Sequence, residues 1–304
     1  MLLAHPHGFC AGVRRAIGTV EEALERYGAP VYVRGEIVHS PYVIEELEER
    51  GARFVRSEDE VPEGAVCVLS AHGVSPAVRR RAYERGLRVI DATCPLVSKV
   101  HGEVRRYARA GRKIVLIGHR GHEEVEGTLG EAPDRIWVVK NEEEIRALPI
   151  GRDEPVAYAI QTTLAVDEAM KLVRALRERF TDLVGPGKED ICYATQNRQA
   201  AVRAIAPKCD LVLVAGAVNS SNSNRLVEVA RRQGTPAYLV PAPSVIDPKW
   251  LEGVSVVGVS AGASAPSRLV DATLARLAEY GFDRVRNHLE MTEDVEFNAP
   301  RFPA

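Results

Sequence analysis

The chain has 304 residues, of which 40 are lysine or arginine and 42 are aspartate or glutamate, and 45% are hydrophobic. This length and apolar fraction are typical of a soluble globular protein with two or three cores, and the near-zero net charge argues against nucleic acid as a partner. No apolar run approaches the roughly 20 residues of a membrane span, and we find no signal or transit peptide. We therefore expect a cytoplasmic protein with no membrane partner.

The predicted elements repeat three times in chain order, with a period of roughly 85 to 100 residues, the size of a small α/β domain. Each copy holds a helix, a strand, a second helix, a short β-rich run, a further strand and a closing helix. In the first copy these elements span residues 11–28, 30–38, 40–51, 52–56, 65–73 and 75–86. In the second they span 95–111, 113–118, 122–130, 135–139, 155–163 and 165–180. In the third they span 193–208, 209–216, 221–234, 236–240, 254–262 and 265–281.

The repeat predicts an α/β fold of three similar lobes, because strands that alternate with helices form mostly parallel sheets. We place the first lobe at residues 1–94, the second at 95–192 and the third at 193–280. Residues 281–304 are expected to form a C-terminal tail that packs back on the lobes.

Three of the five cysteines share a local context. Cys10, Cys94 and Cys192 each lie in a turn that opens the first helix of a copy, where backbone N–H groups and the helix dipole stabilise a thiolate. Cys67 and Cys209 lie in or beside strands and are expected to be buried small hydrophobes. An odd number of widely spaced cysteines argues against a disulfide framework. One thiolate from each of three similar units indicates a single metal centre at their common axis.

The type of metal centre follows from the cysteine spacing. Structural zinc sites usually take cysteines as close pairs and fill all four positions, and the chain has no CxxC pair. A four-iron, four-sulfur cluster held by three cysteines leaves one iron without a protein ligand, open to a substrate oxygen. We therefore favour the iron–sulfur cluster.

Polar side chains gather in the loops that follow the predicted strands, where open α/β sheets bind their ligands. These loops carry His39, His72, His122, Thr162, Thr163, the run 219–222 and Ser264. Taken singly, a serine or asparagine there is more often a helix cap, and a lone histidine a structural hydrogen-bonding group. Together they indicate an anionic, diphosphate-bearing small substrate. The chain has neither GxxxxGK[ST] nor a strand-linked GxGxxG, so we expect neither ATP nor a dinucleotide.

Nine sequence blocks carry a resemblance to a known family. In chain order they read HGFCAGVRRAI, GEIVHSPYV, SAHGVSP, DATCPLVSKVH, GHRGHEEVEGT, QTTL, DICYATQNRQ, NSSNSNRL and AGASAP. They extend from about Gly8 to Pro266 and resemble the 4-hydroxy-3-methylbut-2-enyl diphosphate reductases. The resemblance implies three lobes in a trefoil-like, pseudo-threefold arrangement around a central [4Fe-4S] cluster. It also implies reductive dehydroxylation of (E)-4-hydroxy-3-methylbut-2-enyl diphosphate to isopentenyl and dimethylallyl diphosphates, which ends the methylerythritol phosphate pathway.

The resemblance also implies roles for individual residues. The cluster ligands fall on Cys10, Cys94 and Cys192, the proton donor on Glu124, and the group that positions the substrate hydroxyl on Thr162. The diphosphate contacts fall on His39, His72, His122, Ser220, Ser221, Asn222 and Ser264. Two positions depart from the family pattern: Glu123 stands where the family often has proline, and His7 where many relatives have arginine. We leave His7 out of the site.

Partners and alternatives complete these expectations. The chain has no flavin or nicotinamide motif, so electrons are expected from a separate carrier, by resemblance a ferredoxin or flavodoxin. Residues 79–81 are three consecutive arginines, which form either a solvated helix face or a docking patch for such an acidic carrier. Two other classes stay open: a metal-dependent phosphohydrolase would explain the polar loops, and an iron–sulfur binding or regulatory module would explain the cysteines.

Overall fold

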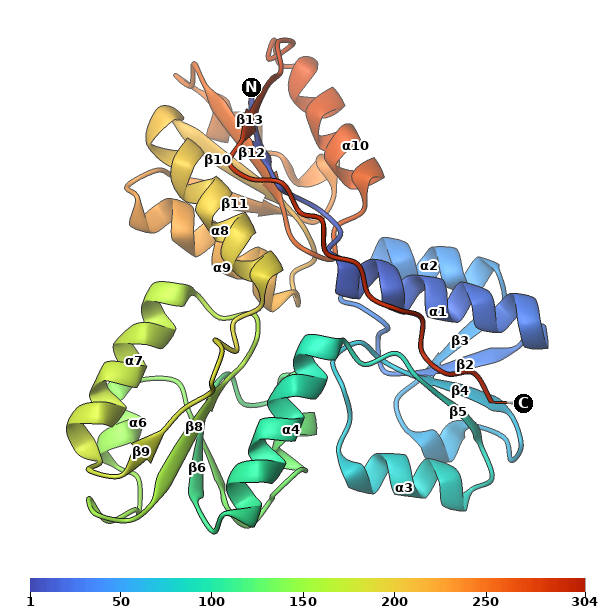
Figure 1. Cartoon of the computed structure of the whole chain (residues 1–304). Helices are drawn as coiled ribbons and strands as arrows, with labels where there is room; N and C mark the ends of the chain where they lie inside the picture. The colour runs from blue at the N-terminus through green and yellow to red at the C-terminus, as the bar shows by residue number, and fades with distance from the viewer. Residues whose placement is uncertain (304) are drawn as a thin grey trace. The chain divides into compact units, whose positions relative to one another are not determined.

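The computed structural model describes residues 1–303, and in that part of the chain all strands pair in parallel within three sheets (Figure 1). Because parallel strands are joined by crossover helices, both faces of such a sheet are covered and its strands are apolar throughout. The three sheets confirm the predicted α/β fold of three lobes. The chain folds into two compact units. One comprises residues 1–14, 39–45 and 193–296, and the other comprises residues 15–38, 46–192 and 297–304.

The first sheet has the strand order β3-β2-β4-β5. Its strands are β2 (Val31–Arg34), β3 (Ala52–Val55), β4 (Val66–Leu69) and β5 (Arg88–Asp91). The helices of this part of the chain are α1 (Ala11–Tyr27), α2 (Pro41–Glu49) and α3 (Pro76–Glu84). Cys67 and Leu69 of β4 pack with Ala82 of α3 in one apolar cluster. The closing strand β5 was not expected from the sequence.

The second sheet has the order β7-β6-β8-β9. Its strands are β6 (Lys113–Ile117), β7 (Ile136–Val139), β8 (Val156–Ile160) and β9 (Leu183–Val184). Its helices are α4 (Pro95–Arg109), α5 (Glu123–Leu129), α6 (Glu142–Arg146) and α7 (Val166–Arg179). Alternate residues of β6 point to opposite faces: Val115 packs with the α7 cluster, and Leu116 packs with the α4 cluster.

The third sheet has the order β11-β10-β12-β1-β13. Its strands are β1 (Leu2–His5), β10 (Leu211–Ala215), β11 (Ala237–Val240), β12 (Val257–Ala261) and β13 (Arg286–Leu289). Its helices are α8 (Tyr193–Ile205), α9 (Ser221–Arg232) and α10 (Ser267–Ala278). Leu213 of β10 packs with α10 residues on one face of the sheet, and Val214 packs with α9 residues on the other. Figure 1 shows these two helices on opposite sides of the strands.

Strand pairing corrects the lobe assignment of the first residues and gives the C-terminal tail a partner in the third sheet. Residues 2–5 were assigned to the first lobe, but β1 pairs with β12 and so belongs to the third sheet. The tail was expected to pack back on the lobes, and its residues 286–289 form an edge strand beside β1. These two strands were not expected from the sequence because β1 and β13 have four residues each, too few for an alternation of apolar and polar residues to show. The lobe limits at residues 94, 192 and 280 stay predictions.

Each of the three predicted cluster cysteines lies where the chain passes from one sheet to the next. β1 of the third sheet precedes Cys10, β5 of the first sheet precedes Cys94, and β9 of the second sheet precedes Cys192. The helix after Cys94 packs on the second sheet, and the helix after Cys192 packs on the third. The loops that hold the cysteines are therefore at the carboxyl ends of strands, where α/β proteins place their ligands.

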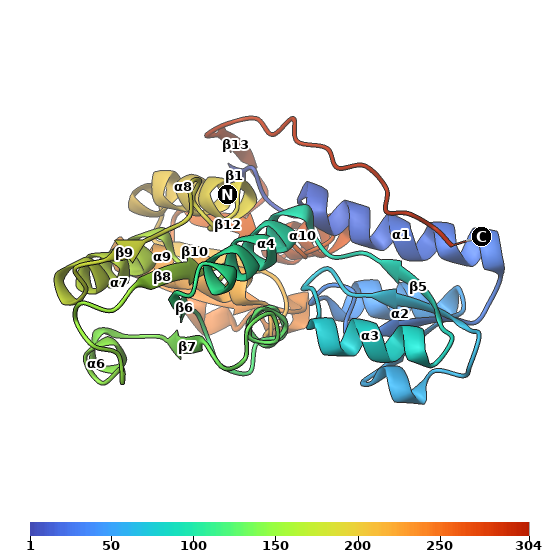
Figure 2. The same cartoon turned by 60° about the horizontal axis from the view of Figure 1, so that its bottom comes forward.

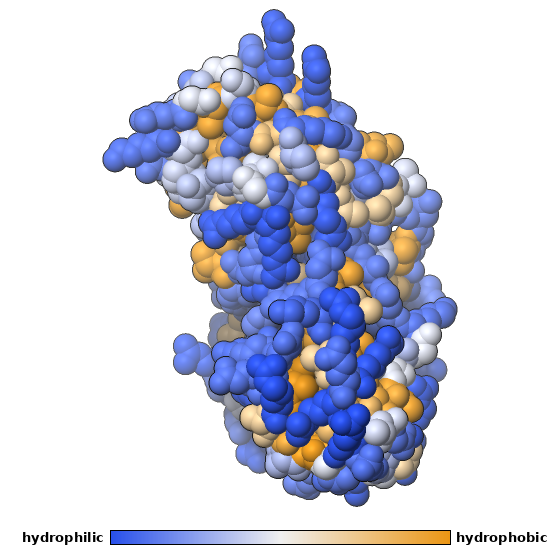
Figure 3. Space-filling view, turned by 90° about the vertical axis from the view of Figure 1, so that its left-hand side faces the viewer, coloured by the Kyte–Doolittle hydropathy of each residue, from blue (hydrophilic) through white to orange (hydrophobic). Residues whose placement is uncertain are grey.

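The last described residues run along α1 in both ribbon views (Figures 1 and 2). The Tyr27 hydroxyl donates to the carbonyl of Pro303 over 2.5 Å, and the guanidinium of Arg26 lies 4.5 Å from the ring centre of Phe302. No helix among residues 1–303 has both the length and the apolar character needed to cross a membrane. On the face in Figure 3, hydrophilic residues cover most of the surface and hydrophobic residues form small separate groups.

Candidate functional site

Glu124, the one acid among the predicted site residues, is buried in the first turn of α5. Its side chain accepts two hydrogen bonds from one residue of the loop after β8: the backbone N–H of Thr162 over 2.6 Å and the Thr162 hydroxyl over 2.9 Å. Glu124 and Thr162 are 3% and 4% exposed. The structure therefore brings together the two residues to which the resemblance assigns catalytic roles.

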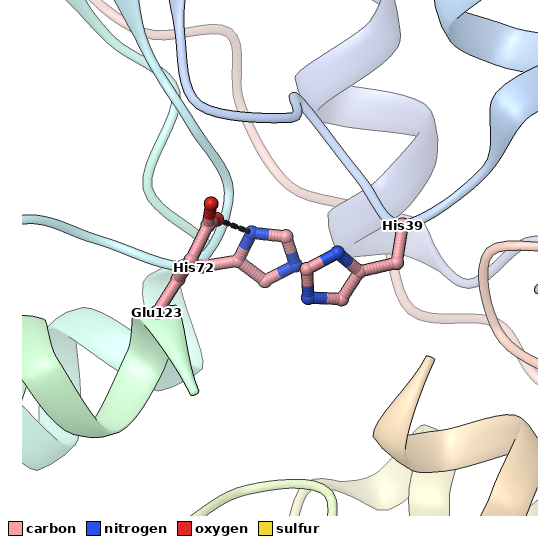
Figure 4. Close-up of side chains that lie close together, drawn as sticks. All are labelled: His39, His72 and Glu123. Carbon is pink, nitrogen blue, oxygen red and sulfur yellow. Dashed lines mark ion pairs between the residues drawn. The ribbon is translucent and has the colours of Figure 1, made fainter. Parts of the chain in front are cut away.

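The other two acids of this segment have different partners. The Glu123 carboxylate forms an ion pair with Nδ1 of His72 over 2.9 Å (Figure 4). The Glu126 carboxylate accepts from the backbone N–H of Gly121 over 3.1 Å and so closes the loop before α5. Consecutive helical residues point about 100° apart, so only one of the three acids can face Thr162. The geometry is consistent with the assignment of the proton donor to Glu124.

Two histidines accompany this pair. His122 is the N-cap of α5, and its Nδ1 accepts from the backbone N–H of Glu124 over 3.2 Å. Because Nδ1 accepts, the ring proton of neutral His122 lies on Nε2. The rings of His72 and His122 are edge to face, with centres 5.9 Å apart. As the cap of α5, His122 thus has the structural hydrogen-bonding role that was weighed from the sequence for a lone histidine, and it also presents an N–H donor.

Cys94 and Cys192 are fixed by backbone hydrogen bonds to neighbouring loops. The N–H of Cys192 donates to the carbonyl of Thr162 over 3.1 Å, so this cysteine directly adjoins the Glu124–Thr162 pair. The N–H of Cys94 donates to the carbonyl of Ala71, the residue before His72, over 3.0 Å. Cys94 is also the N-cap of α4, with no hydrogen bond from its side chain to the helix. Both cysteines therefore adjoin loops that carry predicted substrate residues of this unit.

Cys10 lies in a loop of the other compact unit. Its N–H donates to the carbonyl of Ala263 over 3.3 Å, in the loop after β12, and its sulfur accepts from the N–H of Val13 over 3.5 Å. The Tyr193 hydroxyl accepts from the N–H of Ala11 over 3.2 Å. The loop after β12 and the first turn of α1 therefore hold Cys10 in place.

The predicted phosphate residues of this unit hold the loops in place by internal hydrogen bonds. Asn222 accepts from the N–H of Ala263 over 2.8 Å, and the Ser264 hydroxyl donates to the carbonyl of His39 over 2.8 Å. Ser220 is the N-cap of α9 and accepts from the N–H of Ser223 over 3.3 Å. Ser221 is the first residue of α9. For Ser220 the alternative role weighed from the sequence, a helix cap, is the one that the structure displays.

The two remaining cysteines have the environment of inert thiols. Cys67 is fully buried in β4, and burial raises its pKa to about 12. Burial also raises the pKa of Cys209 to about 11, with a further contribution from the neighbouring Asp210 carboxylate. A thiol with such a pKa stays protonated at neutral pH and is a poor metal ligand. Both contrast with the three cysteines that lie in loops at helix starts.

Comparison with known proteins decides the family. The sequence matches the LytB protein family over residues 1–278. The chain belongs to this family. Among its LytB relatives is a 4-hydroxy-3-methylbut-2-enyl diphosphate reductase from Bordetella pertussis, 56% identical over 301 residues, which are 99% of this chain and 93% of that protein. A protein of the same name from Xanthomonas campestris is 54% identical, over 99% of this chain and 97% of the relative. This LytB protein is therefore an oxidoreductase, as the sequence blocks predicted.

Solved structures agree with this assignment. The structure of the E-1-hydroxy-2-methyl-but-2-enyl-4-diphosphate reductase from Plasmodium falciparum matches with a TM-score of 0.96 at 37% identity, over 99% of this chain and 95% of that one. A second structure, of (E)-4-hydroxy-3-methyl-but-2-enyl diphosphate reductase, matches with a TM-score of 0.65 at 33% identity, over 91% and 98%. Together with the three parallel sheets, these likenesses confirm the predicted fold class of this LytB protein.

Sequence reasoning missed the residues of this LytB protein that support the cysteine loops. Arg15 donates from one guanidinium nitrogen to the carbonyls of Ala92 and Thr93, over 3.2 and 3.1 Å, directly before Cys94. Burial lowers the pKa of Arg15 and raises that of Tyr193 to about 12. Their positions in the sequence could have indicated them, because Tyr193 directly follows Cys192 and Arg15 lies five residues after Cys10.

Proposed function

We propose that the chain reduces (E)-4-hydroxy-3-methylbut-2-enyl diphosphate to isopentenyl diphosphate and dimethylallyl diphosphate, the last step of the methylerythritol phosphate pathway. Two electrons and two protons replace the hydroxyl group by hydrogen and release one water. The observation that carries the proposal is the buried Glu124–Thr162 pair, which adjoins Cys192 through the Thr162 carbonyl. It brings an acid, a hydroxyl and a cysteine together in adjacent loops.

We propose that Cys10, Cys94 and Cys192 hold a [4Fe-4S] cluster. Their fit is supported by their places in loops at helix starts, by the N–H group directed at the Cys10 sulfur, and by the contrast with the two thiols of raised pKa. When bound, such a cluster supplies electrons and, at an iron without a protein ligand, Lewis acidity. The five cysteines, all within residues 1–303, form no disulfide, which suits the reducing cytoplasm, the location that we propose.

Within this proposal Glu124 holds the proton that the leaving hydroxyl takes up. The Thr162 N–H keeps Oε1 occupied, and the Thr162 hydroxyl can turn its hydrogen either toward Oε2 or toward the substrate. A protonated Glu124 would donate from Oε2, with Thr162 orienting both groups. Both side chains are almost completely buried, so Glu124 and Thr162 are shielded from bulk water.

Each compact unit carries donors that suit a diphosphate. In one unit, His122 carries its ring proton on Nε2, and Nδ1 of His72 contacts the Glu123 carboxylate. In the other unit the first turn of α9 offers backbone N–H groups beside Ser221 and Asn222. Asn222 and Ser264 position the loop after β12 through Ala263 and His39. We propose that His39 and Ser220 complete the set of diphosphate contacts.

The electron donor is proposed to be a ferredoxin or flavodoxin, as the resemblance implies. The arginine patch, residues 79–81, gives this proposal little support, because each arginine already has a carboxylate partner. Arg79 pairs with Asp91 over 2.7 Å, Arg80 with Glu84 over 4.0 Å, and Arg81 with Asp59 over 2.7 Å. We therefore propose no docking role for the patch.

One experiment separates the proposed function from the two alternatives. Protein purified without oxygen is examined by absorbance and electron spin resonance, before and after addition of the diphosphate substrate, and products are measured with reduced methyl viologen. A cluster whose spectrum changes with substrate, together with both diphosphate products, is the expected result. Hydrolysis to inorganic phosphate without iron would indicate the phosphohydrolase, and a cluster indifferent to diphosphates would indicate the iron–sulfur module.

A second measurement tests the diphosphate site. Asn222→Ala and Ser264→Ala are expected to weaken binding of the substrate while cluster content stays unchanged. Each removes a hydrogen bond that positions the loop after β12, and a hydrogen bond near a charged ligand is worth roughly 1.5 to 3 kcal/mol. Calorimetric titration of the substrate measures the loss, and an unchanged affinity in both variants would place the diphosphate elsewhere.

A further inference from the structure

Arg198, on α8, is the largest side chain buried to 1% exposure in the part of the chain that the structure describes. Its guanidinium makes five hydrogen bonds, which engage all of its five N–H donors. Nε and Nη2 donate to the carbonyl of Gly8 over 3.0 and 2.7 Å, and Nη1 donates to the carbonyl of Ala194 over 3.1 Å. Nη1 and Nη2 also donate to the two carboxylate oxygens of Glu293 over 2.8 and 3.2 Å.

The Gly8 carbonyl connects this arginine to the loop of Cys10. Gly8 lies two residues before the cysteine, and its φ of +68° is in the left-handed region that favours glycine. The loop is otherwise held on its other side, by bonds from Gly8 and Cys10 to Ala261 and Ala263 after β12. Because Arg198 projects from the helix that follows Cys192, its two bonds to Gly8 tie the Cys10 loop to α8.

Glu293 comes to this place from the C-terminal segment, which lies beyond the residues that match the family. Strand β13 pairs with β1 in parallel, and the N–H of Glu290 donates to the carbonyl of His5 over 3.0 Å, so the segment follows the same course as the Cys10 loop. The Glu293 side chain is 10% exposed, and Asn197 also donates to it, over 3.0 Å. The Glu293 carboxylate has no part in the proposed reaction, cluster ligation or diphosphate binding.

We propose that Glu293 is a positioning residue for the cluster ligand Cys10, acting through Arg198 and the Gly8 carbonyl. This inference rests on the proposed function, since it takes Cys10 as a ligand. A buried guanidinium that loses its carboxylate is an uncompensated charge and draws in water or changes its rotamer. Arg198 would then release the Gly8 carbonyl, and the Cys10 loop would open more often. The C-terminal segment thus retains the cluster from the side of Cys10.

The test compares Glu293→Ala and Glu293→Gln with a matched control, Glu296→Gln, an exposed glutamate three residues further along the same segment. In iron-free protein, the alkylation rate of Cys10 is measured by peptide mass spectrometry against Cys94 as internal reference. In iron-loaded protein, the rate of iron loss to a chelator is measured without oxygen. Glu293→Ala should raise both the Cys10 ratio and the rate of iron loss by about tenfold, because a charge-assisted bidentate pair is lost.

Glu293→Gln should cause a smaller rise, since its amide oxygen still accepts from Arg198, and Glu296→Gln should match the wild type. Unchanged Cys10 alkylation and iron loss in Glu293→Ala would overturn the proposal. Equal rises at Cys10, Cys94 and the buried Cys67 would also overturn it, because they would indicate general unfolding. Wild-type protein that never takes up iron would refute the proposed cluster, whereas the alkylation ratio would still decide the positioning role.

Discussion

The substitution Glu124→Gln tests the proposed acid with little disturbance of the fold. Glutamine has the size of glutamate, its amide oxygen can keep the 2.6 Å bond from the Thr162 N–H, and its NH₂ can donate to a rotated Thr162 hydroxyl. The Thr162 hydroxyl has to turn to keep the second of these bonds, and a weakened hydrogen bond costs about 0.5 to 1.5 kcal/mol in stability. The amide cannot release a proton, so turnover should fall by about 10² to 10⁴.

The assay is product formation with reduced methyl viologen, together with cluster absorbance and substrate affinity, both of which should stay near wild type. Glu123→Gln and Glu126→Gln serve as controls, because their carboxylates face His72 and Gly121 rather than Thr162. They should lower turnover far less. Normal turnover in Glu124→Gln, with an inactive Glu123→Gln or Glu126→Gln, would refute the assignment of the acid while leaving the cluster and the diphosphate site in place.

The packing and the titrating groups give three further predictions. Serine at position 10, 94 or 192 should remove most cluster iron and activity in iron and turnover assays. Cys67→Ala and Cys209→Ala should keep both, because full burial of Cys67 and partial burial of Cys209 raise the pKa values of these thiols to about 12 and 11. Gly130→Ala should lower the melting temperature by an amount that corresponds to about 1 to 3 kcal/mol, because the new Cβ would lie 2.1 Å from Cβ of Ser75. Gly187→Ala is the control, because a Cβ at position 187 would have no atom within 4 Å apart from its own residue and chain neighbours. Burial and the neighbouring Asp190 raise the pKa of Glu103 from 4.5 to about 7. The stabilisation by protonated Glu103 is therefore lost as pH rises through that interval. In urea unfolding at pH 5 and pH 8, Glu103→Gln should show a smaller loss of stability than the wild type.

Much of the fold followed from local sequence. The order of helices and strands in the three copies could be predicted from the sequence. Its helices show apolar residues with a period of 3.6, and its buried strands show short apolar runs. The strands that were missed, β1, β5, β9 and β13, have two to four residues each. Such short segments become strands only through pairing with neighbours that are distant in the chain, as β1 does with β12 and β13.

The candidate site shows the same division. The three loop cysteines stood out from the sequence because a turn before a helix is a local feature, and Glu124 was selected by its motif. Which of three adjacent acids faces Thr162 depends on helix rotation and on the loop after β8, 38 residues away. The carboxylate partners of Arg79 and Arg81 likewise come from other elements of the chain. The Ser220 cap and the Arg80–Glu84 pair, by contrast, are local.

The sequence by itself determined the class of fold, the family and the residue types of the site, because periodicity, turn chemistry and motif spacing are properties of neighbouring residues. Tertiary structure alone decided that the first strand joins the third sheet and that Glu293, from the last part of the chain, pairs with Arg198. The physical reason is that a parallel strand pair and a buried ion pair need two distant segments, and their energies depend on burial that no local pattern encodes.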